Sequence, residues 1–271
     1  SVMSGAVSQL AGGAAPAVAL LVAGRIATVT LNRPDRRNAV SLEMWRELAR
    51  LFEALGRDEA LRGILLTGAG GNFSVGADIA EFASVRATAE QSLEYEVAVD
   101  AASTAIAATP KPVVAAIEGY CLGGGCHLAL ACDFRFVAPD AALGIPAARL
   151  SIVYGVASTR RLLALVGLSA AKRILFSAER FGAEAAVAMG LAERRARAPA
   201  AAAQDFLEGL AENAPLSIAG AKFILNGLAV GEEPLDPAAA QAVIDRASRS
   251  DDYREGREAF AGKRPPAFTG R

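Results

Sequence analysis

The stretch from Val113 to His127 reads VVAAIEGYCLGGGCH. Its opening run, Val113–Ile117, is short and apolar and predicts a strand. Gly119–Gly125 is a glycine-rich loop, and Cys126–Ala131 continues as a predicted apolar helix. This order of strand, glycine loop and helix indicates one unit of an α/β fold.

The same order occurs upstream. Gly63–Thr67 is a second short apolar run that predicts a buried strand, and the glycine-rich loop Gly68–Gly76 follows it and leads to Ala77 and Asp78. Periodicity and turn signals predict these further elements: a hairpin of strands at Ala17–Val22 and Ile26–Leu31, helices from Ser41 to about Arg57 and at Ala89–Ala108, and a strand at Asp133–Ala138. Because strands alternate with helices, the sequence predicts an α/β architecture with parallel strands.

The two ends of the chain have different patterns. Residues 1–16 are small and uncharged, and we interpret them as a flexible N-terminal tail. Beyond about Ala198 the pattern is mainly helical, with helices expected at Ala200–Asn213, Pro215–Gly227, Asp236–Ser248 and Asp252–Phe260. We therefore expect an α/β core over residues 17–198 and a C-terminal helical region over residues 199–271.

Composition excludes several classes of protein. The 271 residues are 53% hydrophobic, which allows a large core and argues against a disordered chain. The 28 basic and 29 acidic residues give a net charge of -1, which argues against a nucleic-acid or anionic-membrane partner. Three cysteines and one histidine favour neither a disulfide framework nor a metal site. No transmembrane or secretory segment is evident, so we expect a soluble protein in the reducing cytoplasm.

The two glycine loops suggest a chemical use. The first backbone N–H groups of a helix have no partner within the helix, and the helix dipole adds partial positive charge there. Glycine lets a ligand approach the backbone closely. Two such loop ends aimed at one point would hold a developing oxyanion. Tight turns and packing also explain either loop taken alone, and neither loop completes the G-x-G-x-x-G pattern of a dinucleotide site.

At these residues the chain resembles the crotonase family, the enoyl-CoA hydratases and isomerases. The resemblance runs from about Ala17 to Phe268 and rests on the order and spacing of several short motifs. These motifs are LNRP at 31–34 with RNA at 37–39, FSVGADI at 73–79, KPVVAAIEG at 111–119, GGGC at 123–126 and EGREAF at 255–260.

The resemblance implies a fold, an assembly and a ligand. The fold is a spiral of ββα units followed by a C-terminal helical region that packs subunits into homotrimers, often paired as hexamers. The ligand is an acyl-CoA thioester, with coenzyme A present only as part of the substrate and no separate cofactor or metal. The N–H groups of Ala77 and Gly124 match the family's oxyanion hole, where they would stabilise an enolate.

The same match places substrate-binding positions along the chain. They are Arg36, Arg37, Ala39, Ser74, Gly76, Asp78, Ile79, Tyr120, Gly123, Pro146, Ala147, Arg149, Phe260 and Lys263. Some have simpler interpretations as well: Arg36 and Arg37 as a solvated pair of charges, Arg149 as part of a surface or intersubunit ion pair, and Asp78 as a helix cap.

The chain departs from the family at two positions. Hydratases of the family place and activate water with two glutamates, whose positions here hold His127 and Ala147. His127 has two interpretations, a general acid or base in place of the glutamate and a neutral histidine packed in the helix. Tyr154 also has two, a proton donor to the substrate and an aromatic core residue.

Two classes of function therefore remain open. The first is an acyl-CoA enzyme of the hydratase/isomerase type that works through a stabilised enolate. Hydration, isomerisation, decarboxylation and carbon–carbon hydrolysis, the last two with His127, are all compatible with it. The second is a non-catalytic acyl-CoA-binding relative. The sequence fixes neither the acyl group nor the choice between trimer and hexamer.

Overall fold

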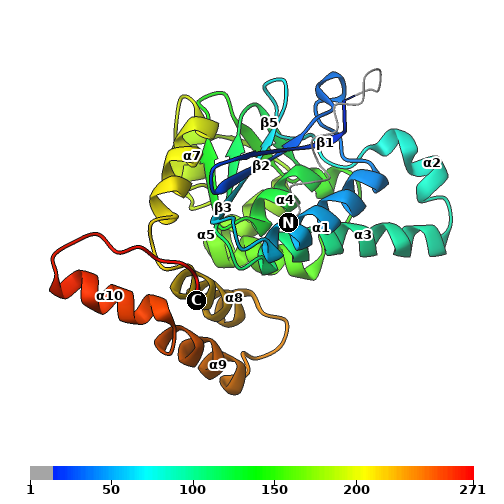
Figure 1. Cartoon of the computed structure of the whole chain (residues 1–271). Helices are drawn as coiled ribbons and strands as arrows, with labels where there is room; N and C mark the ends of the chain where they lie inside the picture. The colour runs from blue at the N-terminus through cyan, green and yellow to red at the C-terminus, as the bar shows by residue number, and fades with distance from the viewer. Residues whose placement is uncertain (1–14) are drawn as a thin grey trace.

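Figure 1 shows the computed structural model, which describes residues 15–271. Most of the tail predicted at residues 1–16 therefore lies outside the described residues. Within them, no helix is long and apolar enough to cross a membrane.

The larger of two sheets has six strands in the order β1-β2-β3-β4-β6-β9. They are β1 (Val18–Ala23), β2 (Ile26–Leu31), β3 (Gly63–Gly68), β4 (Val113–Ile117), β6 (Phe134–Val137) and β9 (Arg194–Arg195). β1 and β2 form the predicted antiparallel hairpin, and every later neighbour pairs in parallel. The predicted α/β architecture with parallel strands is confirmed.

Helices bury both faces of this sheet, which explains why β4 is apolar throughout and β3 is apolar from Gly63 to Leu66. One face packs against α1 (Leu42–Arg57), α3 (Ala89–Ala108) and α4 (Gly124–Ala131). The other face packs against α7 (Pro199–Leu210). Successive residues of β3 alternate between these layers, as the strand pleat requires.

The smaller sheet contains β5 (Tyr120–Leu122), β7 (Ala142–Gly144) and β8 (Arg180–Gly182), in the order β5-β7-β8. β5 lies inside the stretch expected to be loop from Gly119 to Gly125, and α4 begins at Gly124 and not at Cys126. That expectation was wrong because β5 forms by pairing with β7, a partner that the local pattern does not reveal.

The first glycine loop also differs from expectation. It leads into a 3₁₀ turn at Ile79–Glu81 and the single turn of α2 (Phe82–Val85), not into a helix that begins at Ala77. The helix-dipole argument therefore applies to Gly124 and not to Ala77. Between β7 and α7, where no elements were predicted, the chain forms a 3₁₀ turn at Pro146–Arg149, α5 (Val156–Ser177), β8, α6 (Ala183–Ala188) and β9.

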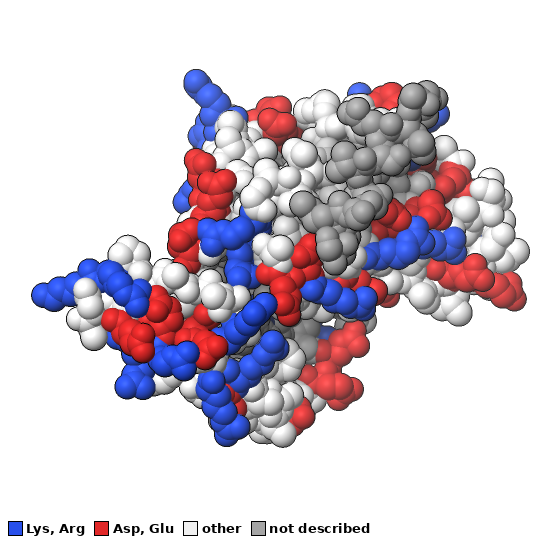
Figure 2. Space-filling view, viewed as in Figure 1, with Lys and Arg blue, Asp and Glu red and all other residues white. Residues whose placement is uncertain are grey.

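The last three helices form a lobe beside the sheets, at the lower left of Figure 1. They are α8 (Pro215–Val230), α9 (Pro237–Ser248) and α10 (Asp251–Ala261). The helical region expected over residues 199–271 also included α7, but Ala203 and Leu207 of that helix are fully buried against the sheet. In the structure the lobe thus begins after α7. Acidic and basic side chains are interspersed on the face in Figure 2, including over this lobe.

Candidate active site

The glycine loop after β3 lies against the start of α4. The N–H of Ser74 donates to the carbonyl of Tyr120 over 2.9 Å, and the N–H of Leu122 donates to the carbonyl of Ser74 over 3.0 Å. An isolated parallel β-bridge between Val40 and Ala77 attaches the same loop to the segment before α1. These pairings bring Ala77 and Gly124, which are far apart in the chain, to one place.

Only glycine fits at the closest approach between the two loops. A Cβ on Gly76 would lie 2.8 Å from the carbonyl oxygen of Leu122 and 2.9 Å from the nitrogen of Gly124. The φ angle of Gly76 is +99°, which disfavours any other residue. A Cβ on Gly124 would in turn lie 3.1 Å from the nitrogen of Ala77.

The amide nitrogens of Ala77 and Gly124 are near neighbours. Because a Cβ is two bonds from its own nitrogen, the 3.1 Å contact places these nitrogens within about 6 Å of each other. Both residues are partly exposed. Neither N–H donates to an acceptor within residues 15–271, whereas the N–H groups of Gly76 and Asp78 on either side of Ala77 are both used.

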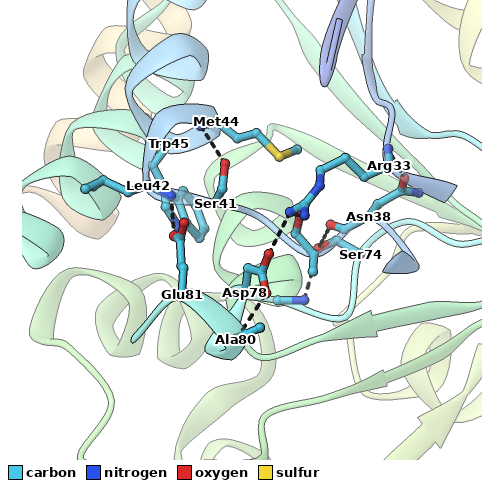
Figure 3. Close-up of polar contacts among 12 residues, drawn as sticks. Arg33, Asn38, Ser41, Leu42, Met44, Trp45, Ser74, Asp78, Ala80 and Glu81 are labelled. Carbon is cyan, nitrogen blue, oxygen red and sulfur yellow. Dashed lines mark hydrogen bonds and ion pairs between the residues drawn. The ribbon is translucent and has the colours of Figure 1, made fainter. Parts of the chain in front are cut away.

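Ser74 and Asp78 hold the loop in place (Figure 3). The buried hydroxyl of Ser74 donates to the carbonyl of Asn38 over 2.7 Å and accepts from the N–H of Gly76 over 3.0 Å. The Asp78 carboxylate forms a 2.9 Å ion pair with Arg33 and caps the following turn by accepting from Ala80. The capping interpretation of Asp78 agrees with this geometry.

His127 lies inside the protein, on the first turn of α4, with 6% of its surface exposed. Its Nδ1 contacts the hydroxyl of Ser158, and its Nε2 lies 3.4 Å from the carbonyl oxygen of Val99. Burial, assisted by the positive charge of Arg161, lowers the pKa of His127 to about 4. The imidazole is therefore neutral near pH 7, with a protein partner at each nitrogen.

Tyr154 packs edge-on against His127, with 6.4 Å between the ring centroids. Its hydroxyl is buried and has no hydrogen-bond partner within the described residues. Burial raises the pKa of this phenol well above its usual value, so the group stays protonated and cannot act as a base.

The segment after β7 carries three of the expected positions. Pro146 opens the 3₁₀ turn, Ala147 within it is buried, and Arg149 at its end is exposed. The methyl group of Ala147 can neither take nor give a proton. Residues 15–271 also contain no cluster of His, Cys, Asp or Glu that could hold a metal ion.

Two arginines contact the ring of Tyr120 on β5. The guanidinium carbon of Arg37 lies 5.4 Å from the ring centroid and that of Arg180 lies 5.2 Å from it. Neither arginine forms an ion pair within the described part of the chain. Arg36 and Ile79 are exposed, Gly123 is partly exposed, and Ala39 is buried with its carbonyl bonded to Arg33.

Phe260 and Lys263 are not brought to this place. Phe260 lies on α10 and is 88% exposed, and Lys263 follows the helix. Figure 1 shows α10 in the C-terminal lobe, away from α4.

Sequence reasoning missed several residues that shape the site. Trp45 on α1 is buried, its edge would be 3.1 Å from a Cβ on Gly124, and its indole N–H donates to the hydroxyl of Tyr95 over 3.0 Å. Ser158 and Val99 hold His127. The apolar spacing that predicted α1 marks Trp45 as buried, but no local signal connects Ser158 or Val99 to His127.

Known proteins resemble this chain along most of its length. The family model for enoyl-CoA hydratase/isomerase matches residues 22–271. A protein of Mycobacterium tuberculosis (strain CDC 1551 / Oshkosh) named as a probable enoyl-CoA hydratase is 37% identical over 253 residues, covering 93% of this chain and 99% of that protein.

Solved structures agree with that match. An enoyl-CoA hydratase/carnithine racemase from Magnetospirillum magneticum is 37% identical with a TM-score of 0.88, covering 95% of this chain and 97% of that one. An enoyl-CoA hydratase/isomerase family protein from Hyphomonas neptunium is 36% identical with a TM-score of 0.89, covering 94% and 98%. The chain described here belongs to the enoyl-CoA hydratase/isomerase family, whose relatives reported above are named as enzymes of that type.

Proposed function

We propose that this enzyme converts an acyl-CoA thioester through an enolate whose oxygen is held by the N–H groups of Ala77 and Gly124. The observation that carries the proposal is the pair of partly exposed amides at these positions, neither of which donates to an acceptor among residues 15–271. Two donors that each lie 2.7–3.1 Å from one oxygen can be at most about 6 Å apart. The nitrogens of Ala77 and Gly124 meet that condition.

The chemistry requires such donors. Removing a proton or a carboxyl group beside a thioester moves negative charge onto the carbonyl oxygen. An N–H group binds this oxyanion more strongly than it binds the neutral carbonyl, so the interaction lowers the barrier. Loss of one such donor reduces turnover about 10²–10³-fold.

The proposed site offers little acid–base chemistry of its own. His127 is neutral and enclosed, and we assign it to packing, not to proton transfer. Ala147 has no titratable group, and Tyr154 stays protonated and cannot act as a base. These residues do not support a hydration that depends on two carboxylates, so isomerisation and decarboxylation stand beside hydration as candidate reactions.

The same observations favour a second candidate, a non-catalytic acyl-CoA-binding protein. With His127 enclosed and a methyl group at Ala147, the thioester carbonyl would be bound and polarised without any group to complete the reaction. Both candidates use the Ala77 and Gly124 amides, and they differ only in turnover.

A panel of thioesters separates them. Crotonyl-CoA, a β-ketoacyl-CoA and malonyl-CoA are each incubated with the protein; binding is measured by calorimetry and products by mass spectrometry. We expect all three to bind and at least one to be converted. Binding of all three without conversion would establish the second candidate, and a folded protein that binds none would refute both.

Arg37 and Arg180 are the groups that we propose for the coenzyme phosphates. Both guanidinium groups are held on the ring of Tyr120 and lack a carboxylate partner among the described residues. A guanidinium group matches phosphate with paired, charge-assisted hydrogen bonds, and stacking on an aromatic ring leaves its N–H groups free to make them.

We also propose that the protein assembles as a homotrimer, or as a hexamer of two trimers, through its C-terminal lobe. α8 is mostly apolar but has no buried residue, and α8, α9 and α10 surround a groove of 680 Å³ lined mainly by apolar side chains, Phe260 among them. Such exposed apolar surface is typical of an interface. Phe260 and Lys263, which lie away from Ala77, would then meet ligand only at the site of another copy.

A further inference from the structure

The direction of the Ala77 N–H is set from outside the glycine loop. The carbonyl of Gly76 and the N–H of Ala77 belong to one planar trans peptide, in which these two groups point in opposite directions. The Gly76 carbonyl accepts a 2.8 Å hydrogen bond from the N–H of Val40. Val40 therefore turns the Ala77 N–H away from itself, toward the side where no acceptor is present within residues 15–271.

The carbonyl of Val40 completes the contact by accepting a 2.9 Å bond from the N–H of Asp78. Val40 is thus hydrogen-bonded to the residues on both sides of Ala77, through its own N–H to Gly76 and through its carbonyl to Asp78. Any shift of Val40 relative to the loop would rotate the Gly76–Ala77 peptide and re-aim the N–H.

Asn38 joins the segment that carries Val40 to the glycine loop. It is fully buried, and its amide group donates to the carbonyls of Ala69 and Asn72 over 2.8 and 2.7 Å. Its side-chain oxygen accepts from the N–H of Arg33 over 2.9 Å, and its own carbonyl accepts from Ser74. The φ angle of Asn38 is +57°, a conformation that asparagine adopts more readily than most residues. Every polar group of this side chain is used to hold loops together.

Arg33 forms a second connection, across the Val40–Ala77 contact. One of its guanidinium nitrogens, Nη1, donates to the carbonyl of Ala39 and to the carboxylate of Asp78, each over 2.9 Å. Ala39 precedes Val40 and Asp78 follows Ala77. Figure 3 shows the guanidinium group of Arg33 pointing toward the carboxylate of Asp78, with a dashed line between them. The pair is only partly exposed, at 26% and 14% of the side chains, so solvent screens it less than a surface pair.

We propose that Arg33 and Asn38 are positioning residues for the oxyanion, because together they fix the direction of the Ala77 N–H without touching the substrate. The inference rests on the proposed function. A charge-assisted hydrogen bond is sensitive to angle and weakens steeply when misaligned. Loss of the Arg33 connection should therefore weaken binding of the enolate while the rest of the thioester binds as before.

The experiment measures the enolate directly. Acetoacetyl-CoA ionises to an enolate that absorbs in the near ultraviolet, and a site with two N–H donors lowers the pKa of the bound ligand. Absorbance is followed against pH for the wild type, Arg33→Gln, Arg33→Lys and Arg50→Gln. Arg50 is an exposed residue of α1 paired with Glu43 and Glu47, so Arg50→Gln is the matched control for loss of one charge.

We expect Arg33→Gln to raise the pKa of the bound ligand by about one unit, because a lost charge-assisted bond is a tenfold effect or larger. Arg33→Lys should restore part of the shift, and Arg50→Gln should leave it unchanged. Affinity for free coenzyme A, which has no acyl carbonyl, should stay within about twofold for all variants, as expected when only the carbonyl contact is altered.

Each other outcome overturns one statement. A wild-type protein that binds acetoacetyl-CoA without lowering its pKa refutes the oxyanion site itself. A wild-type shift that Arg33→Gln leaves unchanged refutes the positioning role alone, and so does an equal loss of affinity for free coenzyme A, which a merely structural role predicts. If Arg33→Gln does not fold, Asp78→Asn removes the same ion pair from its other end with little change of shape, and the same criteria apply.

Discussion

The glycine loops around α4 and the C-terminal lobe differ in how their side chains are buried. In the first region Asn38, Ser74 and His127 are buried, and each has its partners within the same chain. In the lobe, α8 and α9 have no buried residue, and apolar side chains such as Leu225 and Leu228 are 63% and 70% exposed.

This difference separates what one chain can do from what requires other copies. The loops are close-packed, so an added atom there must displace something. The lobe has unsatisfied apolar surface, so its stability should depend on protein concentration. This contrast can be tested by adding a methyl group to each region, by protonating His127 near the loops, and by placing a charge on the lobe.

The largest effect is expected for Gly76→Ala. The new Cβ would lie 2.8 Å from the Leu122 carbonyl and 2.9 Å from the Gly124 nitrogen, at a φ of +99°. One of the two proposed donors must move, so turnover of the best thioester in the panel should fall about 10²–10³-fold. Steady-state kinetics measures this effect.

Gly71→Ala is the matched control. Gly71 lies in the same loop at a φ of +81°, but a Cβ there meets nothing within 4 Å. It imposes similar backbone strain, of about 1–3 kcal/mol, without the steric clash. An equal loss of turnover in both variants would show that loop strain, and not the position of the amides, controls activity.

His127 predicts how stability changes with pH. Its pKa is lowered to about 4 in the folded protein, against about 6.5 in an unfolded chain. Between these values the unfolded state binds a proton and the folded state does not, so stability should fall as the pH falls from about 6.5 to 4. The contribution is fully present above pH 6.5, and about 3 kcal/mol of it should be lost by pH 4.

The comparison is with His127→Gln, measured by urea unfolding at several pH values. Because the chain has one histidine, the difference in pH dependence between the two proteins isolates this group. The variant should lack the added loss of stability below pH 6.5. Parallel curves for the two proteins would mean that His127 is solvated, and its assignment to packing would then be wrong.

Much of the fold follows from local patterns in the sequence. The strand at Val113–Ile117, the buried strand at Gly63–Thr67, the helix at Ala89–Ala108 and the parallel sheet are confirmed. β5 and β7 were missed because each has three residues and forms by pairing with strands distant in the sequence, β5 with β7 and β7 also with β8. α7 resembles the other C-terminal helices in sequence, and only its contact with the sheet separates it from them.

The candidate site was less predictable than the fold. The motifs indicated Ala77 and Gly124, but the direction of the Ala77 N–H depends on Val40, which bonds to the residues on either side of Ala77. The two interpretations of His127 could not be separated without Ser158 and Val99, which come from α5 and α3. Pairings between separate elements carry this information, and no single stretch of sequence contains it.

A charge in the lobe should have a smaller effect, and it should act on assembly. Leu228→Asp places a carboxylate on the exposed apolar side of α8, where it would have to be desolvated at an interface. We expect dissociation of the oligomer to become easier by about 2 kcal/mol, the lower limit for an interface hot spot. Light scattering coupled to size-exclusion chromatography at several concentrations measures the shift.

Leu21→Asp is the control for exposure alone, since Leu21 on β1 is 68% exposed. It should leave the mass unchanged. A wild-type protein that is monomeric at all concentrations would contradict the proposed assembly, and dissociation by Leu21→Asp alone would move the interface from α8 to the edge of the sheet.

The smallest effect is expected for Gly220→Ala, which makes in α8 the same chemical change that Gly76→Ala makes in the loop. Its Cβ would lie 3.7 Å from the Cβ of Val243 on α9, an ordinary contact distance. Alanine in a helix interior is favoured over glycine by about 0.5–1 kcal/mol, so the variant should be more stable by that amount in chemical unfolding. One methyl group would then disable the loop and strengthen the lobe. Destabilisation by Gly220→Ala would instead mean that α8 and α9 are packed against each other as closely as the loops. The two regions would then differ only in the exposed apolar surface that partner copies cover.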